Sequence, residues 1–454
     1  MRNPLLTPEL RELLEEGQHA ELVEVLADLH PNDAAAYLSG LLPEEVAKVL
    51  TLLPLELARV VFSYFDIDVQ ESIILSAGRD EVKKLLAAMP SDDRAAFLEG
   101  LDERVREQIF PLLAQAARDD LIRREQYEAD QVGAVLSTEY CAIAADLLAQ
   151  KAIEEVRHQA PSRETIYVLY VVDKEGHLIG VLSLRDLMIA RSHQRVGEIM
   201  RTEFASVRAS DKAEDAAKVL QQYDLIAVPV VDDQQKLLGI LTYDDAADIL
   251  KEEVTEDIEQ QAGLVGESVT DTYLSEPVTR YFLRRIPWVA ALALCYIVTS
   301  SVVRHFEGRL QTAATILVAF LPMVMATGGN VGAQTATVVI RGLAIGDLKA
   351  SALLAVLWKE LRVSILLAFV LAMVAFGQAW LLGQQDVAGT FRAPAAIAIA
   401  LCVHVISAAV LGALIPIGIS ALRLDPALLA NPALTTLADL SGALIYCLTV
   451  TTLL

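Results

Sequence analysis

Residues 322–347 read PMVMATGGNVGAQTATVVIRGLAIGD and overlap a run, 310–340, that carries no charged residue. This run exceeds the ~20 residues that a helix needs to cross a bilayer. Its polar content is unusual for a helix in lipid, because Asn330 and Gln334 bear amides and the neighbouring glycines leave backbone open. Such groups are costly in a membrane unless they face protein or water. The stretch therefore predicts a membrane helix that lines an ion path or, alternatively, one that only packs closely against other helices.

Four more uncharged or nearly uncharged runs follow the same pattern, at 286–303, 363–385, 393–422 and 426–454. We therefore expect region 281–454 to be an all-α transmembrane domain with five helices. The short loops on the amino-terminal side carry six basic residues (Arg280, Arg284, Arg285, Arg341, Lys349, Arg423), and those on the other side carry three (Arg304, Arg309, Arg392). By the positive-inside rule, the amino-terminal half is cytoplasmic and the carboxyl terminus lies outside the plasma membrane.

The charge of the chain lies almost entirely before the membrane segments. Residues 1–280 hold 27 of the 37 basic and 54 of the 60 acidic side chains. Such an acidic region disfavours nucleic acid as a partner and favours cations. No nucleophile–base pair, phosphate-binding loop or Walker motif is evident, so an enzyme or an ATP-driven pump is not expected.

Residues 1–130 show leucine and alanine at helical spacing, interrupted at Pro31, Pro43 and Pro90. Proline followed by an acid, Asn or Ser is a helix-start signal. The pattern predicts an all-α, superhelical N domain that serves as a docking surface.

Residues 131–195 and 196–250 form an internal repeat. Val132-Gly133 recurs 64 positions later as Val196-Gly197, whereas Gly180 recurs 59 positions later as Gly239. The first copy therefore has about five extra residues, which we place at 158–165. Each copy reads as strands and helices around a Gly-x-x-Ser/Thr-x-x-Asp motif, which resembles a tandem pair of α/β CBS domains.

CBS domains often bind nucleotides, and the resemblance places candidate contacts at Ser183, Arg185, Asp186 and Thr242. The hydroxyl groups could equally be helix caps. Val168 stands where an aromatic residue could stack on adenine, so ATP binding stays open.

Region 251–280 is the predicted linker helix, and acids crowd the stretch that leads into it. Between positions 244 and 259 there are eight acids and one base, Lys251. Positions 245, 248, 252, 256 and 259 share one helical stripe, on which like charges repel. No matching basic stripe lies nearby in the sequence. Divalent cations such as Mg²⁺ would supply the missing charge; a solvated acidic face is the alternative.

The last membrane run contains NPALTTLADLSG at 431–442, in which Asp439 is the one charged residue of segment 426–454. An acid in mid-membrane is a functional candidate by default. Together with GGNVGAQTAT at 328–337 and RGLAIGD at 341–347, this motif resembles the MgtE family of magnesium channels and transporters. The resemblance covers the whole chain, from helical N domain and CBS pair to the linker, or plug, helix and five membrane helices.

The resemblance implies a homodimer in the lipid membrane with one pore on its two-fold axis. The implied pore residues are Asp439, Asn431, Thr435, Asn330, Gly329, Gln334 and Thr337. Cytosolic Mg²⁺ bound between the N domain, CBS pair and plug helix would hold the pore shut. The implied regulatory ligands are Glu214, Asp224, Asp245, Asp248, Glu253, Glu256, Asp257 and Asp425. One position that is acidic in some relatives is Lys212 here.

A mechanism follows from these residues. Mg²⁺ sheds its water reluctantly, so a pore should recognise the hydrated ion. Two Asp439 carboxylates across an axis would match its charge, and the membrane potential would drive it inward. Cytosolic acids would repel one another at low Mg²⁺ and draw together at high Mg²⁺. The rival readings are a transporter for Co²⁺, Mn²⁺, Ni²⁺ or Zn²⁺, and a membrane-anchored nucleotide sensor without a pore.

Overall fold

A computed structural model describes residues 7–264, 277–313, 315–344, 347–348, 352–382, 391–422 and 426–454, without the side chains of 311–313, 315 and 426–432. The chain folds into two compact units, Met1–Lys251 and Glu252–Leu454. The predicted multidomain class is confirmed, with a helical N domain, an α/β CBS pair and five long apolar helices.

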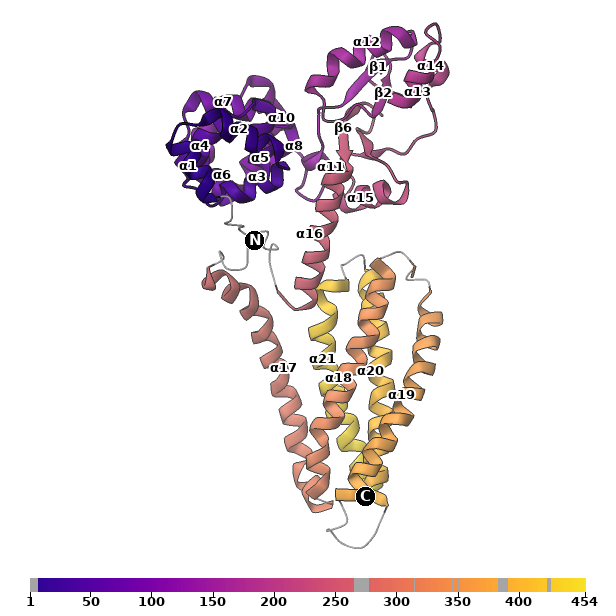
Figure 1. Ribbon diagram of the computed structural model, residues 1–454. Helices are drawn as coiled ribbons and strands as arrows, with labels where there is room; N and C mark the ends of the chain where they lie inside the picture. The colour runs from indigo at the N-terminus through magenta and orange to yellow at the C-terminus, as the bar shows by residue number, and fades with distance from the viewer. Residues whose placement is uncertain are drawn as a thin grey trace. The chain divides into compact units, whose positions relative to one another are not determined.

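The N domain is a succession of short helices around a continuous apolar core (Figure 1). Helices begin at the predicted proline signals, at Pro31, at Pro43 and directly after Pro90, because the first turn of a helix does not need the N–H that proline lacks. The elements are α1 (Thr7–Glu15), α2 (His19–Asp28), α3 (Pro31–Leu38), α4 (Pro43–Leu52), α5 (Leu55–Ser63), α6 (Ile67–Ser76), α7 (Arg79–Ala88), α8 (Ser91–Gly100), α9 (Glu103–Ile109), η1 (Phe110–Leu112) and α10 (Gln115–Arg124).

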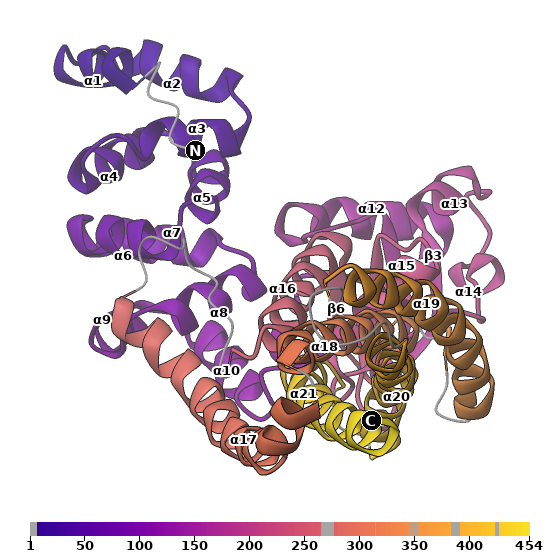
Figure 2. The ribbon, with the colours of Figure 1, turned by 90° about the horizontal axis from the view of Figure 1, so that it is seen from below.

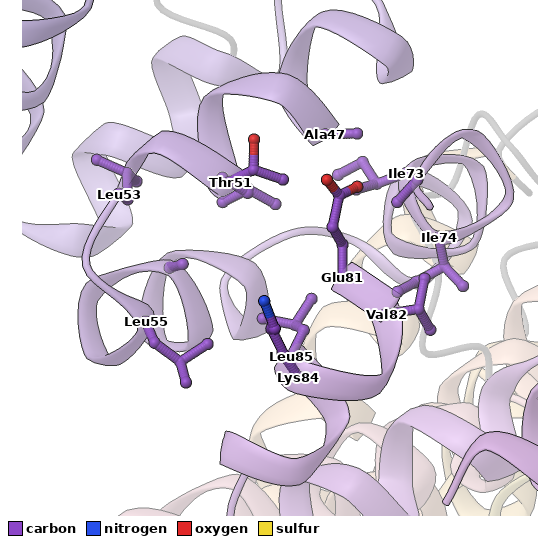
Figure 3. A pocket seen from close by; sticks show the side chains of 13 residues that line it. Ala47, Thr51, Leu53, Leu55, Ile73, Ile74, Glu81, Val82, Lys84 and Leu85 are labelled. Carbon is purple, nitrogen blue, oxygen red and sulfur yellow. The ribbon is translucent and has the colours of Figure 1, made fainter. Parts of the chain in front are cut away.

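A cavity of about 290 Å³ lies between helices α4 and α7 of this domain (Figure 3). Its lining is mainly aliphatic, with Glu81 and Lys84 as the charged members. A divalent cation needs several oxygen ligands. With a single acid in its lining, this cavity is not a candidate cation site.

The two repeats fold alike. Each has a three-stranded sheet, ordered β1-β2-β3 or β4-β5-β6, with one parallel and one antiparallel pair. The first copy comprises α11 (Val132–Val135), β1 (Cys141–Ala144), α12 (Ala149–Gln159), η2 (Ala160–Ser162), β2 (Val168–Val172), β3 (Leu178–Ser183) and α13 (Leu184–Ile189). The second comprises α14 (Val196–Ile199), β4 (Val207–Arg208), α15 (Ala213–Gln222), β5 (Ala227–Val231) and β6 (Leu237–Thr242). The extra residues of the first copy form η2 and the loop after it, where we expected the insertion.

Helix α16 (Tyr243–Gln261) starts directly after β6 and continues without a break past position 250. The stretch contains neither glycine nor proline, which favours one continuous helix. The predicted domain boundary at 250/251 therefore falls inside a helix. Residues 265–276 of the predicted linker lie outside the described part of the chain.

Five helices of the second unit are long and apolar enough to cross a membrane, as predicted. They are α17 (Val278–Ala313), α18 (Thr315–Ala344), α19 (Leu353–Leu382), α20 (Arg392–Ala421) and α21 (Pro426–Leu453). Helices α18, α20 and α21 pack on one another, and Figures 1 and 2 show α17 and α19 on opposite sides of this trio.

Small residues bring α18 and α20 into backbone contact. A Cβ atom built on Gly412 of α20 would lie 2.4 Å from the Gly332 carbonyl oxygen of α18. One built on Gly332 would lie 3.2 Å from the Ala408 carbonyl oxygen. Positions 328, 332 and 335 of α18 thus meet 404, 408 and 412 of α20, so the two helices run parallel through small-residue packing.

We expect Gly412→Ala to destabilise the membrane unit by ~1–3 kcal/mol, because its methyl group would overlap the α18 backbone. The matched control is Gly418→Ala in the same helix, where a Cβ atom meets nothing within 4 Å. That change should be neutral or stabilising by up to ~1 kcal/mol. Thermal unfolding midpoints of the detergent-solubilised protein provide the measurement, and equal midpoints for the two variants would contradict the packing described.

Candidate pore and cation-sensing sites

The first site surrounds Asp439, near the middle of α21. The Tyr296 hydroxyl of α17 donates a hydrogen bond to Asp439 Oδ2 at 3.0 Å. A Cβ atom built on Gly329 of α18 would lie 3.8 Å from Asp439 Oδ1 and 3.7 Å from Thr435 Cγ2. The structure thus brings together Gly329, Thr435 and Asp439, three of the predicted pore residues. It adds Tyr296, which no sequence pattern indicated because the two partners are 143 positions apart.

Three other predicted pore residues, Asn330, Gln334 and Thr337, share one face of α18. All three are exposed within the single chain. The Thr337 hydroxyl donates a hydrogen bond to the Ala333 carbonyl at 2.9 Å, so its donor is satisfied within the helix. The exposed amides of the other two are costly in lipid. This face of α18 therefore requires water or protein against it.

Two predicted positions lie wholly or partly outside the described residues. Asp425 is not among them, and only the backbone of Asn431 is, within α21. Their roles stay predictions.

The second site is a cluster of three carboxylates that come from three different elements of the first unit. Asp92 lies in the first turn of α8, Glu164 in the loop after η2, and Asp245 in the first turn of α16. One carboxylate oxygen of each lies within 4.8 Å of the others. Asp92 Oδ1 and Glu164 Oε2 are buried without a hydrogen bond to any described residue. Oxygen atoms in this state are suited to a hard divalent cation.

Of these three, only Asp245 was predicted. Asp92 follows Pro90-Ser91, which reads as an ordinary helix start and so masks any other role. Glu164 lies in the short insertion that distinguishes the first repeat from the second. The one sequence signal for Glu164 was that an acid lies in a segment that the first repeat has and the second lacks.

Hydrogen bonds around Ser91 hold the N domain against the first CBS repeat beside this cluster. The Ser91 N–H donates to Glu139 Oε2 at 3.0 Å, and its hydroxyl oxygen accepts the Thr138 N–H at 2.9 Å. Buried Arg124 donates to the same hydroxyl at 3.0 Å and pairs with Asp120 at 3.1 Å. The carboxylates are therefore held together by neighbouring contacts despite their mutual repulsion.

Burial shifts the protonation of the cluster. It raises the pKa of Asp245 to about 7 and that of Glu164 to about 8, and the negative charge of Asp92 adds to both shifts. Burial also raises the pKa of Asp92, and burial together with the Asp92 charge raises the pKa of neighbouring Asp93 to about 6. Burial is thus the main cause of these shifts, and the neighbouring negative charges add to it.

A second group of acidic and imidazole ligands, at Asp173, Glu175 and His177, has a simpler explanation. Asp173 Oδ1 accepts the backbone N–H groups of Glu175 and His177, at 3.0 and 2.8 Å, and the His177 side chain lies against Oδ2. In the second repeat, Asp232 accepts the backbone N–H groups two and four residues on in the same way. The group is thus the turn of a β-hairpin, repeated in both copies.

The remaining predicted regulatory acids do not belong to either group of ligands found among the described residues. Glu214 pairs with Lys218 on α15, and Asp224 lies two residues after the end of that helix. Glu256 accepts a hydrogen bond from Gln260 at 2.6 Å. Asp248, Glu253 and Asp257 also lie on α16, and their roles as metal ligands stay predictions.

The end of the acidic stripe has a basic partner beyond the linker. Glu259 Oε2 forms a 2.7 Å ion pair with Arg284 Nη2, and the Arg284 side chain is buried. The pair connects the end of α16 to the start of α17. The sequence did not indicate it because Arg284 lies on the next helix, beyond the linker.

The predicted nucleotide contacts have structural partners. Ser183 Oγ accepts the Asp186 N–H at 3.0 Å as the cap of α13, and Asp186 faces Arg201 at 3.7 Å. The buried Thr242 hydroxyl donates to Asp245 Oδ2 at 2.5 Å, which ties it to the carboxylate cluster. Arg185 is exposed. Capping thus accounts for the Ser183 hydroxyl, and the bond to Asp245 accounts for that of Thr242.

We expect Asp92→Asn to stabilise the cytosolic unit at pH 8 in the presence of a chelator. The raised pKa values mean that the folded unit binds more protons than the unfolded chain between about pH 4 and 8, so its stability falls as the pH rises through that window. Removing one charge should raise the unfolding midpoint by about 2–4 °C, the shift given by ~1 kcal/mol. At pH 5, where Asp245 and Glu164 are protonated, the gain should vanish.

The control is Asp233→Asn, on the exposed hairpin turn of the second repeat, which should leave the midpoint unchanged at both pH values. The same midpoint change at pH 5 and pH 8 for Asp92→Asn would show that charge repulsion is not its cause.

Comparison with known proteins identifies all three parts of the chain. The family model described as a divalent cation transporter (MgtE) matches residues 321–449. The model of the MgtE intracellular N domain matches residues 29–130, and the CBS domain model matches 132–193 and 196–252.

Relatives match at nearly full length. The magnesium transporter MgtE of Thermus thermophilus is 36% identical over 446 residues, which cover 97% of each chain. The magnesium transporter MgtE of Bacillus subtilis is 28% identical over 434 residues, or 96% of this chain and 94% of that one. A solved structure described as the cytosolic domain of the Mg²⁺ channel MgtE in complex with ATP is 35% identical, covers 54% of this chain and 100% of its own, and has a TM-score of 0.50. With a relative this similar along almost its whole length, the chain belongs to the MgtE family of divalent cation transporters.

Proposed function

We propose that two copies of this chain form a channel that conducts Mg²⁺ into the cytosol and closes when cytosolic Mg²⁺ binds to its acidic residues. The observation that carries the conduction part is the position of Asp439. It is a partly exposed carboxylate in mid-membrane, next to the open backbone of Gly329 and the side chain of Thr435. The names of the relatives support magnesium as the ion.

The dimer is proposed from surfaces that one chain leaves uncovered. Of the residues in the most apolar 18-residue stretch of α17, 6% are buried within the single chain, compared with 50% in the corresponding stretch of α20. The amide-bearing face of α18, with Asn330 and Gln334, is exposed as well. A second copy would place the two α18 faces on either side of a water-filled path and supply the polar surroundings that lipid lacks.

The proposed selectivity arises from one carboxylate per chain. Mg²⁺ keeps its water shell, so the pore would hold the hydrated ion through its outer waters. Two Asp439 side chains supply two negative charges, and the Tyr296 hydrogen bond fixes Oδ2 so that Oδ1 stays toward Gly329. Movement would be passive and inward, because the membrane potential contributes about 2.3 kcal/mol per charge per 100 mV.

We expect Asp439→Asn to lower Mg²⁺ uptake into proteoliposomes by about tenfold or more, since ~1.4 kcal/mol of lost ion stabilisation changes an equilibrium tenfold. The matched control is Ser441→Ala on the same helix, which removes a hydroxyl that donates only to the Ala438 carbonyl. Its flux should stay within about twofold of the unmodified protein. Unchanged flux and ion preference in Asp439→Asn would exclude this carboxylate as the selective site.

Regulation is proposed at the cluster of Asp92, Glu164 and Asp245. These residues come from the N domain, the first CBS repeat and the start of α16, so an ion held between them would bind three elements together. Two of their oxygens, Asp92 Oδ1 and Glu164 Oε2, are buried without a hydrogen bond to any described residue, and carboxylate oxygens are the donors that Mg²⁺ prefers. Without the ion their repulsion favours separation, and a ligand that binds one arrangement better shifts the population toward it. The further acids predicted on α15 and α16 would add to the same response.

We expect Glu164→Gln to raise the cytosolic Mg²⁺ concentration that half-closes the channel by about threefold or more, because the site loses one of its three carboxylate ligands. Currents from liposome patches with Mg²⁺ varied on the cytosolic face provide the measurement. Asp173→Asn, which alters the hairpin turn group of acids, is the control and should not shift the half-closing concentration. Equal sensitivity of the Glu164→Gln and unmodified channels would contradict sensing at this cluster.

Three further points are part of the proposal. Oxygen ligands suit hard cations, so Co²⁺, Mn²⁺, Ni²⁺ and Zn²⁺ are tested as competitors in the same uptake assay. ATP is a candidate ligand at Ser183, Arg185, Asp186 and Thr242, supported by a relative whose structure was solved with ATP. The carboxyl terminus is proposed to lie outside the cell, since five spans place the two termini on opposite sides of the membrane.

A further inference from the structure

His404 occupies the centre of the membrane unit, where α20 meets both α18 and α21. Its side chain is fully buried. A Cβ atom built on Gly328 of α18 would lie 1.8 Å from His404 Nε2, and one built on Gly442 of α21 would lie 2.6 Å from it. The imidazole ring therefore fills the space that two side chains, one on each neighbouring helix, would otherwise take.

Both glycines adjoin the candidate pore site. Gly328 directly precedes Gly329, whose open side faces Thr435 and Asp439. Gly442 follows Asp439 by three residues, about one helical turn. The ring thus lies against both helices that carry the pore residues, close to the level where the carboxylate meets the α18 backbone.

A buried polar ring is a poor choice if packing is its only role. Neither ring nitrogen makes a hydrogen bond to any residue in the described part of the chain, although the Met325 backbone lies close by on α18. Burying such groups without partners is unfavourable, whereas an aliphatic side chain would fill the space without that cost. Elsewhere the α18–α20 contact uses small residues, at Gly332, Ala408 and Gly412. At the level of Asp439 it uses a flat, rigid ring instead.

We propose that His404 is a positioning residue of the pore: its ring sets the spacing of α18 and α21 and thereby the gap between the Gly329 backbone and the Asp439 carboxylate. The inference rests on the proposed pore site. It predicts that the size of the group between Gly328 and Gly442 determines ion preference as well as flux.

The test is a double-substitution cycle in proteoliposomes, in which Mg²⁺ uptake is measured as KM and maximal rate and Co²⁺ uptake is measured in parallel. Gly442→Ala should lower the maximal rate about tenfold, because its methyl group would displace the ring. His404→Ala should change the ratio of Co²⁺ to Mg²⁺ uptake about threefold or more, since the gap is no longer set. Combining Gly442→Ala with His404→Ala should restore flux to within about threefold of His404→Ala alone.

The control is Val405→Ala, the next residue of α20, which is equally buried but packs in the apolar core away from the two glycines. It should lower the thermal midpoint without changing the Co²⁺ to Mg²⁺ ratio. If His404→Ala does not assemble, His404→Asn takes its place in the cycle, since it is shorter and still polar. Additive losses in the double variant, or an unchanged ion ratio in the His404 variant, would overturn the proposal.

Asp439→Asn in the same assay separates this inference from the proposed pore. Coupling between positions 404 and 442 with normal flux in Asp439→Asn would refute the pore site but retain a role for the ring in conduction. Loss of flux in Asp439→Asn without such coupling would refute the role of His404 alone.

Discussion

In a bilayer, a polar group is stable only against protein or water, and this constraint organises the membrane unit. Glycines at 328, 329 and 332 leave the α18 backbone open, so α20 and α21 can approach it closely. The Asp439 carboxylate receives a hydrogen bond from Tyr296 of a third helix. The amides of Asn330 and Gln334, by contrast, remain exposed in one chain. The proposed second copy around a water-filled path would satisfy them, so the pore and the dimer are proposed together.

In the cytosolic unit, the main constraint is that three acidic side chains are gathered at one point. Asp92, Glu164 and Asp245 come from elements that are distant in sequence, and hydrogen bonds through Ser91 and Arg124 hold those elements together. Burial, and then the repulsion between these acids, raises the pKa values of Asp245 and Glu164. In the proposed regulation, a bound divalent cation would offset this repulsion, whereas its absence would favour separation. The same repulsion that burdens the fold can therefore make it sensitive to the cation concentration.

Sequence patterns located the polar membrane residues well but gave little information about their partners. Asp439 is conspicuous as a lone charge in an apolar run, and helix spacing alone places Asn330, Gln334 and Thr337 on one face. Tyr296 and His404 have no such signature, because their significance lies in contacts with other helices, which the order of residues along the chain does not reveal. Glu164 was similarly hidden in a short insertion. Arg284 could not be matched to its partner Glu259, because the linker separates the helices on which the two residues lie.

The sequence by itself determined the classes of structure, since hydrophobic run length specifies membrane helices, proline positions specify the starts of the short helices, and the repeated glycine and aspartate spacings specify two copies of one α/β domain. These signals are local or periodic, so they can be read along the chain. Only the tertiary structure decided which carboxylates share a site and which helices meet at the glycines. Such contacts depend on packing between distant segments, where a shift of a few ångströms separates a cation site from a set of unrelated surface acids.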